Sequence, residues 1–354
     1  MNIEKLLEGA VKGGASDLFL IAGLPATYKV QRRMEKQSEG FLTPQDTRLL
    51  IGEVYELASR DRQARLDKGL DDDFSFAVPG MGRFRINVFR QRGSYAAVIR
   101  VIQFGLPDPA VIGIPDEVMD FASSSKGLVL ITGAAGTGKS TTLACIIDRI
   151  NSTREGHIVT MEDPIEYVHR HKRCIVSQRE IAVDVPDYPE ALSSAMRESP
   201  DVILLGEMRN QETISAAMSA AEVGVLLFST MHTFNAANTI GRIVDAYPAM
   251  QQYQIKMQLA LTLEGIVCQQ LLPGVDGTLV PVFEVLKSNA AIQNMIREDK
   301  LHQLDSAIQA GGSQGMCTMD MSLLRLVKEG RITRETALMN CIHLETMTKR
   351  LAQV

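Results

Sequence analysis

The chain has 354 residues, of which 45% are apolar and 22% charged, and its formal net charge is −5. This composition is typical of a globular protein and excludes disordered and fibrous classes, while the length fits roughly two domains. A negative net charge gives no general attraction to nucleic acid, which disfavours a helicase. The scattered cysteines disfavour a disulfide framework and a thiolate zinc site; they are Cys145, Cys174, Cys268, Cys317 and Cys341.

The apolar runs of the chain are too short to cross a membrane. The longest, LVLI and VGVLLF, fall far short of the roughly 20 residues that a spanning helix needs. The opening MNIEKLLEGAVKGG carries acidic residues in an amphipathic pattern and differs from a secretory signal peptide. We therefore expect no transmembrane segment and a cytoplasmic location.

The first hundred residues predict a small α+β domain. An apolar stripe over 3–11 indicates a short amphipathic helix, and DLFLIA over 17–22 indicates a strand. A second helix is expected from Pro44 to about Ala58, because Thr43 can cap it and proline suits a first turn. DDFSFAV, RFRINVFRQ and SYAAVIRVI then alternate like an antiparallel meander. Residues 103–115, rich in proline and glycine, are the expected linker.

After residue 115, apolar strands alternate with helices. Strands are predicted at LVLIT, HIVTME, DVILLGE and VLLFSTMH, and helices from Lys139, near Ala191 and near Thr213. This order implies right-handed crossovers and a parallel sheet covered by helices on both faces. From about Ala236 we expect the chain to be mostly helical.

Residues 133–140 read GAAGTGKS and match the phosphate-binding pattern G-x-x-x-x-G-K-[ST] between a predicted strand and a predicted helix. Its glycines let the backbone curl so that N–H groups and the following helix face the phosphates. We expect Lys139 to reach the β- and γ-phosphates and the Ser140 hydroxyl to bind Mg²⁺. The predicted nucleotide-binding residues are Gly133, Gly136, Thr137, Gly138, Lys139, Ser140 and Thr141.

Acidic residues follow two further predicted strands. DVILLGE ends in Glu207, which we expect to hold Mg²⁺ through water or to orient the attacking water. TMEDPIE places Glu162, Asp163 and Glu166 where a parallel strand ends, and open α/β sheets bind ligands there. Taken alone, Glu207 is better explained as a helix cap or a salt-bridge partner, and Asp163-Pro164 as the start of a turn. The phosphate loop favours the catalytic interpretation.

Several motifs occur in one order along the chain: GAAGTGKSTTLA, TMEDPIEYVH, CIVSQREI, SAMRESPDVILLGEMR and STMHT. Together with GRFRINVFRQRG and GMCTMDMSLLRLVKEGRIT, they resemble the secretion ATPase superfamily, and specifically PilT-type ATPases that retract type IV pili. The resemblance implies an α/β fold with three parts. These are a PAS-like domain over 1–102, a linker over 103–115, and a RecA-like P-loop ATPase domain over 116–354 with a parallel sheet and a helical C-terminal part.

The resemblance also implies roles for single residues. Lys139 and Ser140 belong to the family's Walker A loop, which binds ATP and Mg²⁺. Glu166 is the last acid of an acidic box that activates water, and Glu207 belongs to the Walker B element near the metal. STMHT resembles the family's His box and assigns nucleotide sensing to His232.

The family forms hexameric rings with ATP at subunit interfaces, so arginines of one subunit are expected at the nucleotide of another. Arg83 and Arg85 alternate along a predicted strand and share one face, and Arg197 and Arg209 flank DVILLGE. A solvated surface is the alternative for each arginine. The implied partners are a homohexamer, an inner-membrane pilus platform protein and a second retraction ATPase. They place the chain at the inner face of the cytoplasmic membrane.

The chain departs from the family pattern at four positions. Asn210 stands where the Walker B segment often has aspartate, and Phe19 stands where the first strand often has histidine. Val225 stands where the His box usually has a first histidine, and Gln293 stands where a C-terminal motif usually has arginine. The function that the resemblance implies is a motor for pilus retraction and twitching motility. Two alternatives are a PilU-like accessory ATPase that depends on a partner, and a nucleotide-binding ring adaptor with little hydrolysis.

Overall fold

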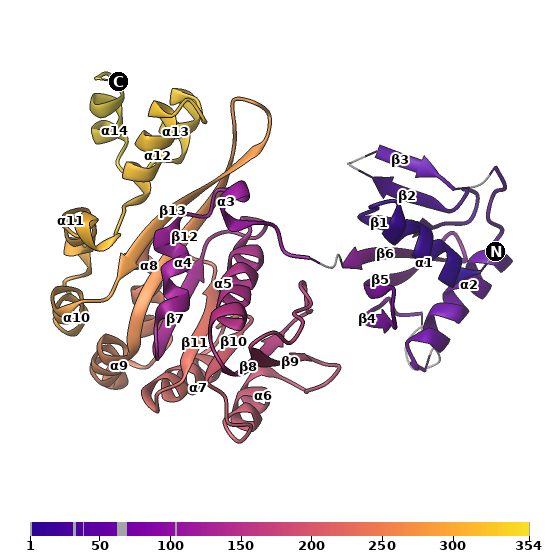
Figure 1. Ribbon diagram of the computed structural model, residues 1–354, viewed down its shortest axis with the longest axis horizontal. Helices are drawn as coiled ribbons and strands as arrows, with labels where there is room; N and C mark the ends of the chain where they lie inside the picture. Colours follow the sequence, from indigo (N-terminus) through magenta and orange to yellow (C-terminus); the bar gives the residue numbers. More distant parts are fainter. Residues whose placement is uncertain (1, 31–32, 38, 62–68, 103–104, 354) are drawn as a thin grey trace. The chain divides into compact units, whose positions relative to one another are not determined.

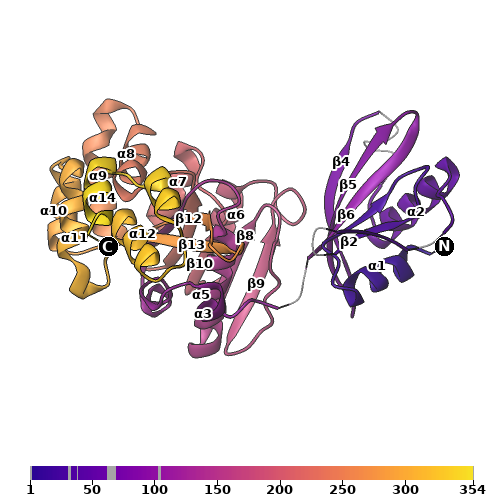
Figure 2. The same ribbon diagram turned by 90° about the horizontal axis from the view of Figure 1, so that it is seen from above.

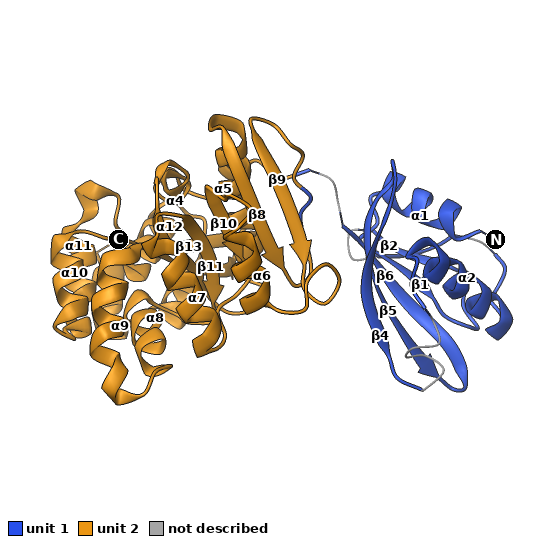
Figure 3. Cartoon of the chain, turned by 90° about the horizontal axis from the view of Figure 1, so that it is seen from below, with its two compact units in different colours: residues 1–105, 166–168 blue, residues 106–165, 169–354 orange. Residues whose placement is uncertain are grey.

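The computed structural model describes residues 2–30, 33–37, 39–61, 69–102 and 105–353. The chain forms two compact units (Figure 3). Unit 1 comprises residues 1–105 with 166–168, and unit 2 comprises residues 106–165 and 169–354. The expected linker over 103–115 starts at residues 103 and 104, which lie outside the described residues. Its later part belongs to unit 2 and contains the short helix α3 (Pro109–Ile112).

Unit 1 is a six-stranded antiparallel sheet with two helices, α1 (Ile3–Lys12) and α2 (Pro44–Leu57), on one face (Figure 1). The strand order is β3-β2-β1-β6-β5-β4. The strands are β1 (Asp17–Leu20), β2 (Thr27–Val30), β3 (Arg33–Lys36), β4 (Asp72–Val78), β5 (Gly82–Gln91) and β6 (Ser94–Ile102). The meander expected from the sequence corresponds to β4, β5 and β6, whereas the β2–β3 hairpin was not predicted.

Local sequence chemistry sets the elements of unit 1. Helix α2 begins where expected, because Thr43 accepts the N–H of Asp46 at 3.2 Å and the Asp46 carboxylate accepts the N–H of Thr43 at 2.8 Å. In β5, Phe84, Ile86 and Val88 alternate inward and pack against the helices. The residues between them consequently face away from the core.

Unit 2 contains a mixed seven-stranded sheet in the order β13-β12-β7-β11-β10-β8-β9. The strands are β7 (Gly127–Thr132), β8 (Gly156–Glu162), β9 (Cys174–Glu180), β10 (Val202–Leu205), β11 (Leu226–Met231), β12 (Leu263–Pro273) and β13 (Leu279–Lys287). Strand β13 is antiparallel to β12, and all other neighbours are parallel. The carboxyl ends of six strands therefore meet at one edge, which is where α/β sheets bind ligands.

Helices cover both faces of this sheet (Figure 2). Helix α5 (Lys139–Thr153), with α4 (Asp116–Met119), packs on one face, and α6 (Tyr188–Ala195) with α7 (Gln211–Glu222) packs on the other. The remaining helices are α8 (Ala236–Asp245), α9 (Ala249–Thr262), α10 (Ala290–Arg297), α11 (Leu304–Ala310), α12 (Met319–Lys328), α13 (Arg334–Asn340) and α14 (Leu344–Leu351). No helix in the described part of the chain is long and apolar enough to cross a membrane.

Most of the described chain after Ala236 is helical, as expected, but residues 263–273 and 279–287 form β12 and β13, which were not predicted. These strands pair over nine positions, from Gly265↔Lys287 to Pro273↔Leu279. Most of their residues are buried on both faces of the sheet, so they read as apolar runs without alternation. Periodicity cannot distinguish such a strand from a buried helical segment.

Candidate active site

The GAAGTGKS segment forms the turn between β7 and α5 that its sequence predicts. All of β7 is buried in the middle of the sheet, and α5 begins at Lys139 directly after the turn. Gly138 precedes the helix with a φ of 88° and has no side chain to cap it. An anion therefore meets no competing cap at the first N–H groups of α5.

Strand β12 packs directly against this loop. At two positions of the loop, only glycine leaves room for that strand. A Cβ on Gly133, whose φ is 141°, would lie 2.2 Å from the carbonyl oxygen of Gln269. A Cβ on Gly138 would lie 3.0 Å from the side-chain Nε2 of the same glutamine. The loop therefore adopts a left-handed backbone where side chains are also sterically excluded.

The Lys139 ammonium lies within the curve of the loop. Its Nζ donates to the carbonyl oxygens of Gly133 at 2.9 Å and Ala134 at 2.8 Å, and the residue is buried. Half-buried Ser140 follows it in the first turn of α5. An ammonium group and a hydroxyl at the start of a helix are the groups needed for phosphate oxygens and for a phosphate-bound Mg²⁺. The residues thus fit a nucleotide with its metal.

Glu207 lies two residues beyond the carboxyl end of β10, at the same edge of the sheet. Its side chain is only 13% exposed, and its carboxylate is 2.5 Å from the Arg209 guanidinium and 3.6 Å from Nε2 of His232. The turn is tied to β11 because the Thr230 hydroxyl donates to the Gly206 carbonyl at 2.7 Å. The structure thus brings together the predicted Walker B acid, the His-box histidine and one predicted arginine.

Two groups close to Glu207, Tyr188 and Arg209, have raised pKa values. Burial, together with the negative charges of Glu207 and Asp163, raises the pKa of Tyr188, so that its phenol stays neutral. The hydrogen bond with Glu207 raises the pKa of Arg209. The Glu207 carboxylate therefore has one permanent cation beside it and a neutral phenol nearby.

The predicted acidic box follows β8. The Glu162 carboxylate accepts the Thr160 hydroxyl at 2.6 Å and the Gln178 amide at 3.2 Å. Glu180, a buried acid at the end of β9, accepts the N–H of Ile165 at 3.2 Å and so anchors the loop. Glu166 is exposed and belongs to the 166–168 segment grouped with unit 1. Its expected place near the phosphate loop stays a prediction.

Comparison with known proteins identifies the family. A family model described as type II/IV secretion system protein matches residues 1–329. The chain belongs to this family. It is 43% identical over 337 residues to the type IV pilus retraction ATPase PilT of Pseudomonas aeruginosa, covering 95% of this chain and 97% of the relative. It is 39% identical over 340 residues to the type IV pilus ATPase PilU of the same species, covering 96% and 88%.

A solved structure of this family shares the fold. The crystal structure of the pilus retraction motor PilT with bound ADP superimposes with a TM-score of 0.90, at 42% identity and 99% coverage of both chains. These relatives, with the phosphate loop described above, establish a secretion-family P-loop ATPase with an α/β fold. The resemblance inferred from the motifs is thereby confirmed.

The other predicted arginines of this ATPase are placed differently from Arg209. Arg83 and Arg85 share the face of β5 that lies opposite the helices, as expected, but they belong to unit 1. The Arg85 guanidinium makes a two-point contact with Asp73, at 2.7 and 3.0 Å. Arg197 is exposed in the connection that enters β10 at its amino end, the edge opposite the phosphate loop. The structure does not bring Arg197 to the site of its own chain.

Val225 also lies at the edge of the sheet away from the phosphate loop. It directly precedes β11, is buried, and accepts the N–H of Gly127 through its carbonyl at 3.1 Å. His232 follows the opposite end of the same strand and is half exposed. Val225 therefore packs in the core at the end of β11 opposite to His232.

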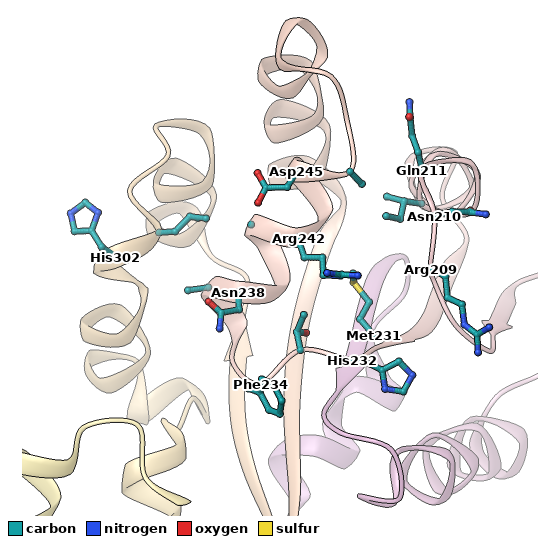
Figure 4. Close-up of a pocket in the computed structure, with 16 residues that line it drawn as sticks. Arg209, Asn210, Gln211, Met231, His232, Phe234, Asn238, Arg242, Asp245 and His302 are labelled. Atoms are coloured by element: carbon teal, nitrogen blue, oxygen red, sulfur yellow. The ribbon is translucent and has the colours of Figure 1, made fainter.

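A cleft of about 820 Å³ opens beside His232 and Arg209 (Figure 4). Asn238, Arg242 and Asp245 of α8 form part of its wall, and His302 also lines it. The Walker A residues do not line it. The cleft thus borders the predicted nucleotide-sensing loop without being part of the phosphate site.

Two buried polar residues of the site region were not predicted from the sequence. Gln269 of β12 hydrogen-bonds to the phosphate loop and to α5. Glu284 of β13 is fully buried and accepts the N–H of Ala236 at 2.8 Å and of Met319 at 3.4 Å, the first residues of α8 and α12. The only available signal was a polar residue within an apolar run, in CQQLLP and in VPVFEVLK.

Proposed function

We propose that this ATPase is a hexameric motor that powers type IV pilus retraction and twitching motility. The similarity to a retraction ATPase across 95% of the chain carries the proposal, because it extends far beyond the phosphate loop. On this proposal the ring acts on an inner-membrane platform protein at the inner face of the cytoplasmic membrane. A second retraction ATPase is a further proposed partner.

The proposed chemistry assigns a task to each group of the site. The loop N–H groups, the start of α5 and Lys139 bind the β- and γ-phosphates. Mg²⁺, held by Ser140 and through water by Glu207, would neutralise charge that develops on the phosphates. Glu166 orients the attacking water, His232 responds to the nucleotide through Glu207, and Arg209 holds the Glu207 carboxylate.

We also propose that Arg83 acts at the nucleotide of a neighbouring subunit, and mixing two impaired variants tests this. Arg83→Ala is expected to lower turnover by about tenfold, below the full effect of a lone arginine finger because several arginines share the charge. Arg83→Ala subunits are mixed with Lys139→Ala subunits in equal amounts. If the two residues act across one interface, about a quarter of the interfaces carry both wild-type residues, and turnover should rise to about that fraction of the wild-type value. ATP turnover of the purified mixture is measured. A mixture no more active than its components would contradict action in trans.

A cell-based experiment tests retraction and the alternative role. The PilU relative matches 96% of the chain, and Gln293 lies half-buried in the first turn of α10, where retraction motors are expected to carry arginine. The gene is expressed in Pseudomonas aeruginosa strains that lack either PilT or PilU, and twitching zones are compared. A retraction motor restores movement without PilT, and Lys139→Ala does not. Restoration only in the strain that lacks PilU would favour an accessory ATPase.

A further inference from the structure

Gln269 holds two parts of the phosphate site together. Its Nε2 donates to the carbonyl oxygen of Thr137 at 2.7 Å, and its Oε1 accepts the hydroxyl of Thr142 at 2.8 Å. Thr137 belongs to the loop and Thr142 to the first turns of α5, whereas Gln269 is 132 and 127 positions away in sequence. One side chain of β12 therefore joins the loop to the helix that follows it.

The chemistry of the two contacts fixes the orientation of this amide. The Thr137 carbonyl can only accept, so it requires the NH₂ end of the glutamine. The oxygen end then faces the Thr142 hydroxyl, which donates to it. Gln269 is 3% exposed. A buried amide with both ends bonded resists rotation, because turning it would leave polar groups without partners.

The same residue also touches the loop through its backbone. Its carbonyl oxygen occupies the space that a Cβ on Gly133 would need, and its Nε2 borders Gly138. Between these points Ala134, Ala135 and Gly136 are exposed. The middle of the loop thus faces solvent. Gln269 contacts the loop near both of its ends, at Gly133 and at Gly138.

We propose that Gln269 is a positioning residue that holds the Walker A loop in its phosphate-binding shape before the nucleotide arrives. A loop fixed in advance loses less conformational entropy on binding, so this device raises nucleotide affinity. Gln269 itself need not contact the phosphates. The inference rests on nucleotide binding by the loop and is independent of pilus retraction.

The test compares two neighbouring glutamines of the same strand. Gln269→Met keeps the length and volume of the side chain but removes both hydrogen bonds. Gln270→Met makes the same change on the opposite face of the sheet. Titration with a fluorescent ADP and Mg²⁺ gives Kd for each, and thermal unfolding without nucleotide gives Tm. Gln269→Met should bind ADP about tenfold more weakly than Gln270→Met.

Thr142 provides a second route to the same result. Thr142→Val removes the hydroxyl without changing the shape, and Thr142→Ser keeps it, so the serine variant should bind ADP more tightly than the valine variant. Thr142→Val should weaken ADP binding less in the Gln269→Met protein than in the wild type. The hydrogen bond between Thr142 and Gln269 is already lost in the Gln269→Met protein. In steady-state kinetics, KM for ATP should rise more than kcat falls.

The proposal is overturned if Gln269→Met and Gln270→Met give equal Kd values for ADP. A lowered Tm with an unchanged Kd would overturn it as well, since Gln269 would then serve stability alone. If Gln269→Met does not fold, the Thr142 pair decides, and equal Kd values for Val and Ser contradict the proposal. Failure of the wild-type protein to bind ADP would remove the nucleotide site itself.

Discussion

Glu207→Gln lowers the ATP turnover number by about 10³-fold, within the range that a positioned catalytic group contributes. The change keeps the size of the side chain but removes the charge that is expected to hold the metal-bound water or to orient the attacking water. It also turns the ion pair with the Arg209 guanidinium, now 2.5 Å from the carboxylate, into a hydrogen bond to a neutral oxygen. Affinity for ADP should change little, because the phosphate loop and Lys139 are intact. Turnover and Kd are measured on the same purified sample.

Two matched variants make this result specific. Glu212→Gln changes an exposed glutamate in the first turn of α7, on the segment that follows Glu207, and should keep the wild-type turnover. Glu166→Gln should also reduce turnover while ADP binding persists, if Glu166 orients water as proposed. Turnover of Glu207→Gln close to that of Glu212→Gln would show that Glu207 has no chemical role.

Replacing Glu284 changes how stability depends on pH. Burial, with a smaller contribution from Asp305, raises the pKa of Glu284 from 4.5 to about 7, against two backbone N–H groups that lower it. Between these values the folded protein binds more protons than the unfolded chain, so the free energy of unfolding falls as pH rises. The contribution of Glu284 is complete below the unfolded pKa and is lost as pH rises through the folded pKa. The loss amounts to about 3 kcal/mol.

Glu284→Gln removes this titration and keeps an oxygen that accepts from Ala236. Urea unfolding at about pH 5 and about pH 8 gives the free energies of both proteins. Between these two pH values, the difference between the two free energies of unfolding should shift in favour of the variant by about 2.5 kcal/mol. Glu212→Gln, whose glutamate is exposed, should show no such shift. A difference between wild type and Glu284→Gln that is constant with pH would contradict the elevated pKa.

Functional groups that are contiguous in the sequence could be predicted from it. The phosphate loop is contiguous, so spacing alone predicted its strand, its turn and the start of α5 at Lys139. The placement of Glu207 followed from a general rule about the carboxyl ends of parallel strands. Both predictions needed only neighbours in sequence and one property of the sheet.

The missed features depend on contacts between distant segments. Gln269 acquires its role from Thr137, which lies 132 positions earlier, and nothing around Gln269 in the sequence indicates that contact. Glu284 stands in an apolar strand and bonds to the starts of two helices 48 and 35 positions away. By contrast, the predicted strand VLLFSTMH already had Val225 and His232 at its two ends, and β11 differs from it by one residue at each end.

The order of strands in unit 2 has a consequence for synthesis. Strand β7 ends at Thr132, yet its neighbours in the sheet are β11, which ends at Met231, and β12, which ends at Pro273. The ribosome therefore releases the glycine loop long before the strands that flank it exist. Pairings over such separations form slowly, and until then the apolar β7 lacks its partners. A nascent chain that ends before β12 therefore carries the phosphate loop without the strand and the Gln269 side chain that pack against it.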